Sequence, residues 1–207
     1  DVPVHYDRYS AESGFGYGTR GKPFNPRATA TMVRRLESCF AQVFAESPFG
    51  AGEVITSAGA YVGKPGYHGR GEAFDLDGVF WGNTQLVATE YPAKPHLYLA
   101  IESIVRQHFG TVLGYLYNAA HRDHLHFDAS TPVGFQKMSK SRVEYLQGAL
   151  LYVHGYQVGV DGVWGLETAE VTKAALQDLG LNTNISTRAT WVAFLQATAS
   201  RAFALAQ

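Results

Sequence analysis

The chain has 207 residues, of which 46% are hydrophobic and 17% are charged, a balance that excludes an intrinsically disordered protein and is typical of a globular one. This length is sufficient for one sizeable hydrophobic core or two modest ones. The net charge of −1 gives no excess of positive charge that would favour binding to nucleic acid or an anionic membrane. No apolar run approaches the roughly 20 residues that span a bilayer.

The location of the protein is indicated only by its first residues and its composition. The chain begins with DVPVHYDRYS, which is not a signal peptide, so the sequence fits a cytosolic protein or one whose leader has been removed. The low charge and the many glycine and tyrosine residues favour a secreted or periplasmic protein. The single cysteine, Cys39, rules out an internal disulfide and is expected to be a buried structural thiol.

The predicted elements begin after an arm without periodicity. Residues 1–24 are rich in Gly, Tyr, Ser and Pro, and we expect them to be irregular. Asn25 and Pro26 resemble a helix N-cap followed by proline at the first helical position. Apolar residues then recur at helical spacing, which predicts an amphipathic helix as far as Glu46.

A mixture of strands and helices is predicted for the segment that follows. Strands are expected at 53–61 and 72–80, on either side of a loop rich in glycine and proline. A helix is expected at 96–108, followed by strands at 111–117 and 124–129. Because these strands are short and need not be parallel, we predict an α+β fold with a small antiparallel sheet and flanking helices.

Composition divides the chain into two predicted domains. Residues 1–132 would form the sheet-containing domain, and residues 133–142 would form a linker with several basic residues. Residues 143–207 are mostly helical and are expected to form a C-terminal three-helix domain. Its helices are predicted at 142–154, 166–179 and 187–205.

Two of the predicted strands carry side chains that are suited to chemistry. Side chains alternate across a strand, so Asp75 and Asp77 share one face of EAFDLDGVF. In the same way, His124, His126 and Asp128 share one face of HLHFDA. If the two strands pair in antiparallel orientation, the carboxylates and imidazoles face each other with roughly 5 Å between their Cβ atoms.

These groups form a candidate metal site. Zinc binds imidazole and carboxylate, and a catalytic zinc site has three protein ligands and a water molecule. His68 lies in a glycine-flanked loop before Asp75 and completes a set of two histidines and one aspartate with His126. A single histidine in such a pattern is more often a hydrogen-bonded surface residue, and it is the joint occurrence that favours a metal site.

The residues of this site also resemble a known family. The segment HGRGEAFD, from His68 to Asp75, resembles the H-x-x-G-x-A-x-D motif of the zinc D-Ala-D-Ala carboxypeptidases and related endopeptidases. The segment TVLGYLYNAAHRDHLHFD resembles the extensin-like C-terminal branch of that group, in a superfamily with lysostaphin-like and hedgehog-like proteins. The resemblance covers roughly residues 30–130 and implies that His68, Asp75 and His126 bind Zn²⁺.

The same resemblance implies two candidates for catalysis. The general base of the family is an acidic residue three positions before the last ligand, which matches Asp123. Lysostaphin-like relatives have a catalytic histidine two positions before that ligand, which matches His124. We favour Asp123 as the base and His124 as the stabiliser of the transition state, because a carboxylate can accept a proton from zinc-activated water and an imidazole can hydrogen-bond the oxyanion.

Four further residues are candidates for secondary roles. His121, Asp77 and Asp128 are candidates to orient the ligand imidazoles, although solvated polar residues would have the same sequence pattern. Arg70 lies in the motif loop and is a candidate for substrate contact. The arginine that commonly follows the preceding strand in relatives is absent after AGAY, which favours an endopeptidase over a carboxypeptidase that must bind a free carboxylate.

The C-terminal part resembles the small three-helix peptidoglycan-binding repeat. It carries the L-Q-x-x-L, hydrophobic-D-G-x-x-G and T-x-x-x-V patterns of that repeat. Asp161 and Gly162 provide a tight turn, and Gly165 precedes the next helix. A purely structural helical cap on the first domain would show the same pattern of turn and helix-start residues.

These features predict a secreted or periplasmic zinc peptidase that hydrolyses an amide bond in the peptide of bacterial cell-wall peptidoglycan. Peptidoglycan would be both substrate and ligand, and the protein is expected to be a monomer. One alternative is a non-catalytic cell-wall-binding protein with a structural zinc site, and another is a metal-dependent hydrolase of a different amide or of a polysaccharide. The enzyme is favoured over the binding protein because structural zinc usually has a fourth protein ligand.

Overall fold

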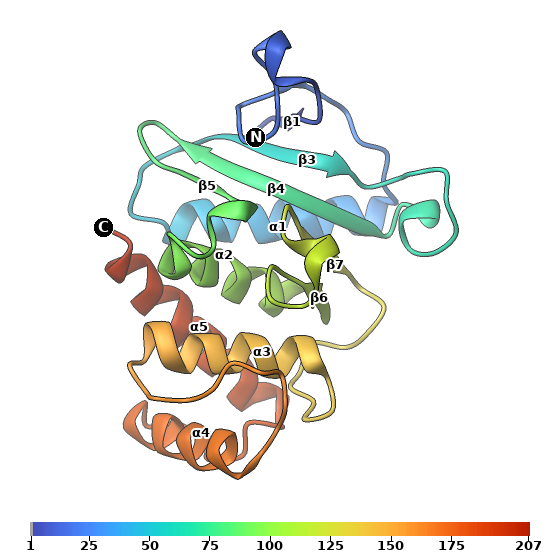
Figure 1. Ribbon diagram of the computed structural model, residues 1–207. Coiled ribbons are helices and arrows are strands. Elements are labelled where there is room, and N and C mark those ends of the chain that lie inside the picture. The colour runs from blue at the N-terminus through green and yellow to red at the C-terminus, as the bar shows by residue number, and fades with distance from the viewer. Residues whose placement is uncertain (1) are drawn as a thin grey trace.

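The computed structural model describes residues 2–207 and shows a twisted sheet with its helices gathered on one face (Figure 1). Within these residues the sheet has seven strands in the order β2-β1-β3-β4-β7-β6, with β5 paired to β4. β1 runs parallel to β3, and the other pairs are antiparallel. The predicted α+β class is therefore confirmed.

The regular elements have the following bounds. The strands are β1 Val4–Tyr6, β2 Lys22–Pro23, β3 Gly52–Gly59, β4 Ala73–Trp81, β5 Gln85–Val87, β6 Thr111–Leu113 and β7 Leu125–Asp128. The α-helices are α1 Ala30–Glu46, α2 Pro95–His108, α3 Lys140–Gly148, α4 Leu166–Asp178 and α5 Arg188–Leu205. α3 continues directly into a π-helical turn, η5 Ala149–Val153.

The first helix begins later than its sequence suggested. The N-cap of α1 is Thr29, whose side chain accepts a hydrogen bond from the backbone N–H of Met32. The predicted cap at Asn25 and Pro26 is therefore wrong. The hydroxyl of Thr29 can cap a helix as well as the side chain of Asn25 can, and Thr29 lies nearer the apolar face of the helix. Cys39 on that face is fully buried, as predicted, and burial raises the pKa of its thiol.

The N-terminal arm belongs to the sheet. β1 pairs with both β2 and β3, so the prediction of an irregular segment at 1–24 is wrong for Val4–Tyr6 and Lys22–Pro23. Strands of three and two residues are too short to show a periodic pattern, which explains why the sequence did not reveal them. The arm therefore lies along the edge of the sheet, on the side away from α1 and α2 (Figure 1).

The strand predicted at 111–117 is shorter than expected. β6 ends at Leu113, because the chain turns at Gly114. A Cβ atom at Gly114 would lie 2.8 Å from the hydroxyl of Tyr98, so this close approach requires glycine. The following residues form a loop that leads to β7, and β5 is a further strand that the sequence did not predict.

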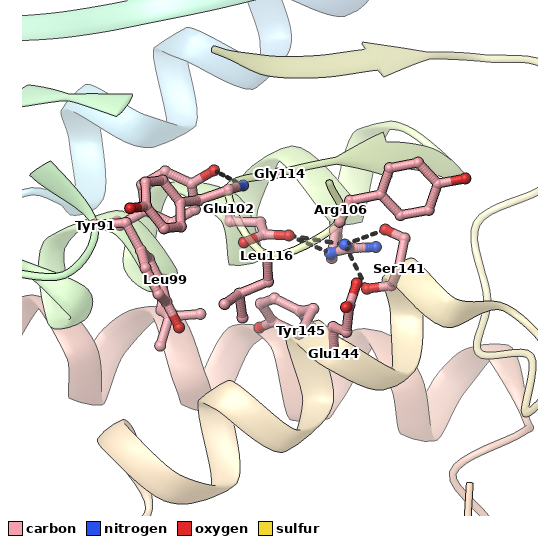
Figure 2. Close-up of a pocket in the computed structure, with 12 residues that line it drawn as sticks. Tyr91, Leu99, Glu102, Arg106, Gly114, Leu116, Ser141, Glu144 and Tyr145 are labelled. Atoms are coloured by element: carbon pink, nitrogen blue, oxygen red, sulfur yellow. Dashed lines mark hydrogen bonds and ion pairs between the residues drawn. The ribbon is translucent and has the colours of Figure 1, made fainter. Parts of the chain in front are cut away.

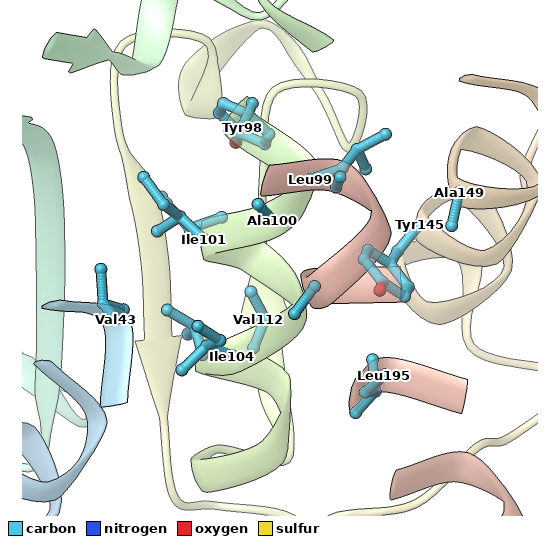
Figure 3. Close-up of a cluster of buried hydrophobic side chains, with 14 of the residues drawn as sticks. Val43, Tyr98, Leu99, Ala100, Ile101, Ile104, Val112, Tyr145, Ala149 and Leu195 are labelled. Carbon is cyan, nitrogen blue, oxygen red and sulfur yellow. The ribbon is translucent and has the colours of Figure 1, made fainter. Parts of the chain in front are cut away.

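The helix α2 lies at the centre of the hydrophobic core. Its residues from Leu97 to Arg106 are buried on every side, as expected for a helix enclosed by other elements. Figure 3 shows Ile104 on the side of Val43 in α1, whereas Leu99 lies toward Tyr145 in α3. The core therefore extends from the sheet layer through α2 to the C-terminal helices.

The C-terminal helices share this core with the sheet. Leu195 of α5 is fully buried, and the ring of Trp191 lies 5.7 Å from that of Tyr145. Phe135, in the segment predicted as a linker, is buried with its ring 5.2 Å from that of Trp191. The two-domain division remains a sequence-based interpretation, and the packed core continues across residues 133–142.

A buried ion pair within α2 is hydrogen-bonded to α3 (Figure 2). Nε and Nη2 of Arg106 donate hydrogen bonds to Oε1 of Glu102 at 2.9 and 2.7 Å. Nη2 of Arg106 also donates to the carbonyl and hydroxyl oxygens of Ser141 at 3.0 and 2.9 Å. The hydrogen bonds from Arg106 to Ser141 therefore join α2 to α3, and loss of either charge of the ion pair would leave the other buried and unpaired.

No helix in residues 2–207 has both the length and the apolar character that crossing a membrane requires.

Candidate metal centre

Three side chains from different elements converge on the face of the sheet opposite the main core. His68 begins a short 3-10 helix, η2 His68–Arg70, while Asp75 lies in β4 and His126 in β7. Asp75 and His126 are direct partners in the antiparallel register that joins the two strands. One ligand atom from each of the three residues lies within 4.8 Å of the others, so this group could hold a metal ion.

The spacing of the three ligand atoms suits zinc. Nε2 of His68 lies 3.2 Å from Oδ1 of Asp75 and 3.1 Å from Nδ1 of His126. Nδ1 of His126 lies 2.8 Å from the same oxygen of Asp75. Ligand atoms about 2.0–2.1 Å from a tetrahedral zinc ion would be roughly 3.3 Å apart, so small adjustments suffice for all three to bind one ion.

The outer nitrogen of each imidazole is already engaged. Nδ1 of His68 lies 2.7 Å from the carbonyl oxygen of Ala60, to which it can only donate. Nε2 of His126 lies 3.3 Å from Oδ2 of Asp128. With protons on those two nitrogens, the inner nitrogens present lone pairs to the carboxylate of Asp75, and three acceptor atoms face one another. Such an arrangement favours a bound cation, and outer-shell acceptors of this kind orient metal-binding histidines.

The loop that carries His68 depends on glycine. At Gly69 a Cβ atom would lie 1.9 Å from the carbonyl oxygen of Lys64, so any other residue would force the loop apart. Gly71 has φ of 67°, and its backbone N–H donates to the carbonyl of His68 at 3.0 Å. This left-handed conformation favours glycine, and it lets the chain enter β4 directly after η2.

Burial and charge act in opposite directions on the ligand side chains. Burial alone would lower the pKa of His126, but its hydrogen bonds with Asp128 and Asp75 raise the pKa to about 9. Burial alone would raise the pKa of Asp75, but hydrogen bonds with His126 and His68 hold the pKa well below its usual value. Without a metal ion, therefore, a proton on His126 offsets part of the charge of Asp75 and Asp128.

His124 and Asp123 form a hydrogen-bonded pair beside the three ligand residues. Nδ1 of His124 lies 2.7 Å from Oδ1 of Asp123, and Nε2 of His124 lies 3.7 Å from Oδ1 of Asp75. The imidazole thus stands between the carboxylate of Asp123 and the ligand group. Burial would raise the pKa of Asp123, but its hydrogen bonds with Arg8 and His124 lower it.

A residue from the N-terminal arm holds the second oxygen of Asp123. Nη1 of Arg8 donates to Oδ2 of Asp123 at 2.6 Å, and Nε and Nη2 donate to Oδ2 and Oδ1 of Asp77 at 2.9 and 2.6 Å. The hydroxyl of Tyr17 donates to the backbone carbonyl of Asp123 at 2.6 Å. Sequence reasoning missed Arg8 and Tyr17, because nothing local distinguishes them from other residues of the arm.

The candidates for secondary roles occupy different places. Asp128 accepts from His126 and so has the predicted orienting contact. Asp77 is fully buried and contacts Arg8, not an imidazole. Burial raises the pKa of Asp77; the contact with Arg8 opposes this rise, and the nearby Asp7 adds to it. The expectation that Asp77 orients a ligand imidazole is therefore wrong, because a third element, the arm, supplies its partner.

His121 and Arg70 make no hydrogen bond with the ligand side chains among the residues that the structure describes. Nδ1 of His121 is hydrogen-bonded to Oδ1 of Asn118, and its ring centroid lies 5.1 Å from that of His124 and 6.0 Å from that of His126. Burial and the charges of these two histidines lower the pKa of His121 to about 4, so His121 is neutral near pH 7. Arg70 is exposed and ion-paired with Glu72 at 2.7 Å.

The chemistry available at this site follows from the number of side chains that could bind a metal ion. Among residues 2–207, the metal-ligating group consists of three side chains, which leaves a tetrahedral ion one position for water or substrate. An imidazole whose far nitrogen is hydrogen-bonded to a carboxylate stands next to that group. This arrangement is suited to metal-assisted hydrolysis.

Comparison with known proteins is consistent with this site. No curated protein and no solved structure matches the chain. Residues 50–138 match the family model described as extensin-like protein C-terminus. The matched segment contains His68, Asp75, Asp123, His124 and His126, and it leaves out the arm and the C-terminal helices. In this segment, less than half of its length, the chain is therefore similar to the C-terminal domain of extensin-like proteins.

Proposed function

We propose that the protein is a zinc-dependent peptidase that hydrolyses an amide bond in the peptide part of bacterial peptidoglycan. The observation that carries this proposal is the three-residue ligand group with the His124–Asp123 pair beside it. The similarity of residues 50–138 to the extensin-like C-terminal family supports the same class of chemistry. A cell-wall substrate implies that the protein acts outside the cytoplasm, in the periplasm or after secretion.

His68, Asp75 and His126 would hold the metal, and the remaining residues act around it. Bound zinc would polarise the scissile carbonyl and lower the pKa of a water molecule toward ~7. Nε2 of His124 lies 3.7 Å from Oδ1 of Asp75 and can accept the proton of the attacking water and pass it to the leaving amine. Oδ1 of Asp123 accepts the hydrogen bond of the opposite ring nitrogen and holds the imidazole in place.

This assignment differs from the one favoured from the sequence, in which Asp123 is the base and His124 stabilises the transition state. Both oxygens of Asp123 are engaged, one by His124 and the other by Arg8. A carboxylate in that position stabilises an imidazolium more readily than it takes a proton from water, because its hydrogen bonds favour the charged form. We therefore propose His124 as the acid–base residue and Asp123 as the residue that orients it.

An endopeptidase fits the surroundings of the site better than a carboxypeptidase. A carboxypeptidase needs a cation to bind the free carboxylate of its substrate, with arginine the usual choice. Arg70, the arginine of the motif loop, is ion-paired with Glu72 and stacks on the ring of Tyr67 at 4.2 Å. Its guanidinium is thus already engaged by groups of the same loop.

The C-terminal helices are proposed to hold the protein on the cell wall. Their resemblance to a peptidoglycan-binding repeat supports this role, and attachment to the polymer would raise the local concentration of substrate. The alternative of a non-catalytic cell-wall-binding protein with a structural zinc site is disfavoured by the open fourth position, since structural zinc is usually closed by four protein ligands.

Incubation of the purified protein with peptidoglycan sacculi tests the proposal. We expect zinc-dependent release of new amino groups that a chelator abolishes and added zinc restores. His126→Ala should lose bound zinc and activity together, whereas His124→Ala should keep zinc and lose turnover. His96→Ala is a matched control, because His96 is half-buried outside the candidate site and contacts the carbonyl of Tyr152. Binding to sacculi without any chelator-sensitive release would support the non-catalytic alternative instead.

A further inference from the structure

The guanidinium of Arg8 joins the N-terminal arm to two carboxylates of different kinds. Asp77, in the middle of β4, is fully buried and receives two of the hydrogen bonds of Arg8. Asp123 lies in the loop before β7, with a half-exposed side chain, and receives the third. The planar fork of arginine can satisfy both acceptors at once, which the point charge of a lysine cannot.

The loop that carries Asp123 is attached to the core at its start, where the backbone N–H of Tyr115 donates to the Tyr98 hydroxyl and Lys140 donates to the carbonyl of Tyr117. Residues 114–124 lie outside the sheet, in a turn and a short 3-10 helix, η4 Ala119–His121. At its end, Nη2 of Arg8 also approaches the carbonyl oxygen of Asp123 at 3.4 Å, and the Tyr17 hydroxyl donates to that oxygen at 2.6 Å. The arm therefore contacts both the side chain and the backbone of Asp123.

The arm itself is well placed to act as a rigid support. β1 is paired to β3 immediately before Arg8, and the guanidinium lies 4.9 Å from the ring centroid of Tyr17. Asp77 cannot move without disturbing β4, which is paired on both sides. Through Arg8, the end of the loop that carries Asp123 is tied to β4, whose residues are nearly all buried.

We propose that Arg8 is a positioning residue for the reaction, so that the N-terminal arm contributes a functional side chain to the active site. By binding Oδ2 of Asp123, Arg8 leaves Oδ1 to His124 and fixes the direction in which the imidazole faces the ligand group. The proposal extends beyond the segment similar to extensin-like proteins, because Arg8 and Tyr17 lie before residue 50. Its kinetic consequence rests on the proposed peptidase function.

A purely structural role for Arg8 must be separated from this one. Removing Arg8 alone would leave Asp77 buried without its partner, so loss of activity could reflect unfolding. The double variant Arg8→Gln, Asp77→Asn removes the guanidinium and the carboxylate together and leaves an amide pair in their place. Arg20→Ala is the matched control, because Arg20 belongs to the same arm and is ion-paired with Glu53 at the surface.

The kinetic test uses the full-length, zinc-loaded protein and a soluble muropeptide. For the double variant we expect kcat to fall by about 10- to 100-fold, because small misplacements of a reacting group have effects of this size. KM and zinc content should stay within about twofold of the wild type, and Arg20→Ala should retain wild-type kcat. In Arg8→Ala, millimolar guanidinium should restore part of the lost kcat.

An unchanged kcat in the folded double variant would overturn the proposal. Should that variant not fold, Arg8→Lys takes its place, since lysine keeps the charge near Asp77 and cannot span to Asp123. A fall of kcat in Arg8→Lys with unchanged KM and zinc content supports positioning, and wild-type kcat overturns it.

Hydrogen exchange provides a readout that does not depend on activity. With zinc bound, amides of residues 119–124 should exchange faster in the double variant than in the wild type, while those of β7 remain protected. Equal exchange in the two proteins would overturn the positioning role. If the wild type proved inactive on peptidoglycan, the proposed function would fail, and the exchange comparison would still decide whether Arg8 holds the Asp123 loop.

Discussion

Zinc binding should become stronger as the pH rises from 7 to 9. The pKa of His126 is raised to about 9 in the folded protein, despite burial, by its contacts with Asp128 and Asp75. The metal must bind a neutral imidazole, so it has to displace this proton throughout that pH range. Competition is therefore strongest at low pH and ends once the pH exceeds the folded-state pKa.

The size of this effect follows from the pKa. At pH 7, two units below a pKa of about 9, roughly 1% of His126 is neutral, so the apparent zinc affinity should be about 100-fold below its plateau. This corresponds to about 2.7 kcal/mol, with a tenfold gain for each pH unit up to about 9. The sign is fixed because the raised pKa stabilises the form of His126 that cannot bind the metal.

Competition with a chromophoric chelator, corrected for protonation of the chelator, measures the apparent affinity at each pH. Calorimetry in buffers of different ionisation enthalpy counts the protons released, and His126 should contribute about one at pH 7 and none well above pH 9. His96→Ala should give the same profile as the wild type. Equal zinc affinities at pH 7 and pH 9 would refute the reasoning, as would full zinc binding by His126→Ala.

Three further changes test the surroundings of the site and the core. Asp128→Asn should weaken zinc binding by about 10- to 100-fold above pH 9, because the acceptor that orients His126 loses its charge. At pH 7 the loss of affinity measured with the same chelator should be smaller, because the variant also binds the competing proton on His126 less strongly. Thr29→Ala should lower the free energy of unfolding in urea by about 1 kcal/mol, because the α1 cap is lost. Leu195→Ala should lower it by about 2–5 kcal/mol, and circular dichroism and tryptophan fluorescence should shift together if the core unfolds as one unit.

The pairing of β4 with β7 could be predicted because both strands alternate with a period of two. Phe74 and Leu76 on β4 are buried on the core face, which places Asp75 on the opposite face. Once β7 is paired antiparallel, the register puts Asp75 beside His126. A local pattern thus determined the most important contact of the site, and a glycine-rich loop of fixed length brought His68 to it.

The contacts of the arm could not be predicted in this way. Arg8 meets Asp77 and Asp123 across 69 and 115 residues of sequence, and no periodic pattern relates positions so far apart. The arm is held by strands of two and three residues, whose pairing depends on the finished sheet. The start of α1 was misplaced for a related reason, since several residues before a helix can cap it and the three-dimensional path selects one.

The choice between Asp123 and His124 shows which part of the sequence pattern carried information. Both residues match a family spacing, so the motifs alone left two candidates. Alternation, however, places a side chain two positions before His126 on the face of the ligand and a side chain three positions before it on the other face. The regular strand begins only at Leu125, so the rule does not extend to Asp123. Nε2 of His124 lies 3.7 Å from Oδ1 of Asp75, and the carboxylate of Asp123 contacts the opposite nitrogen of the same imidazole. These contacts therefore favour His124 for proton transfer, and Asp123, held by Arg8, for fixing its direction.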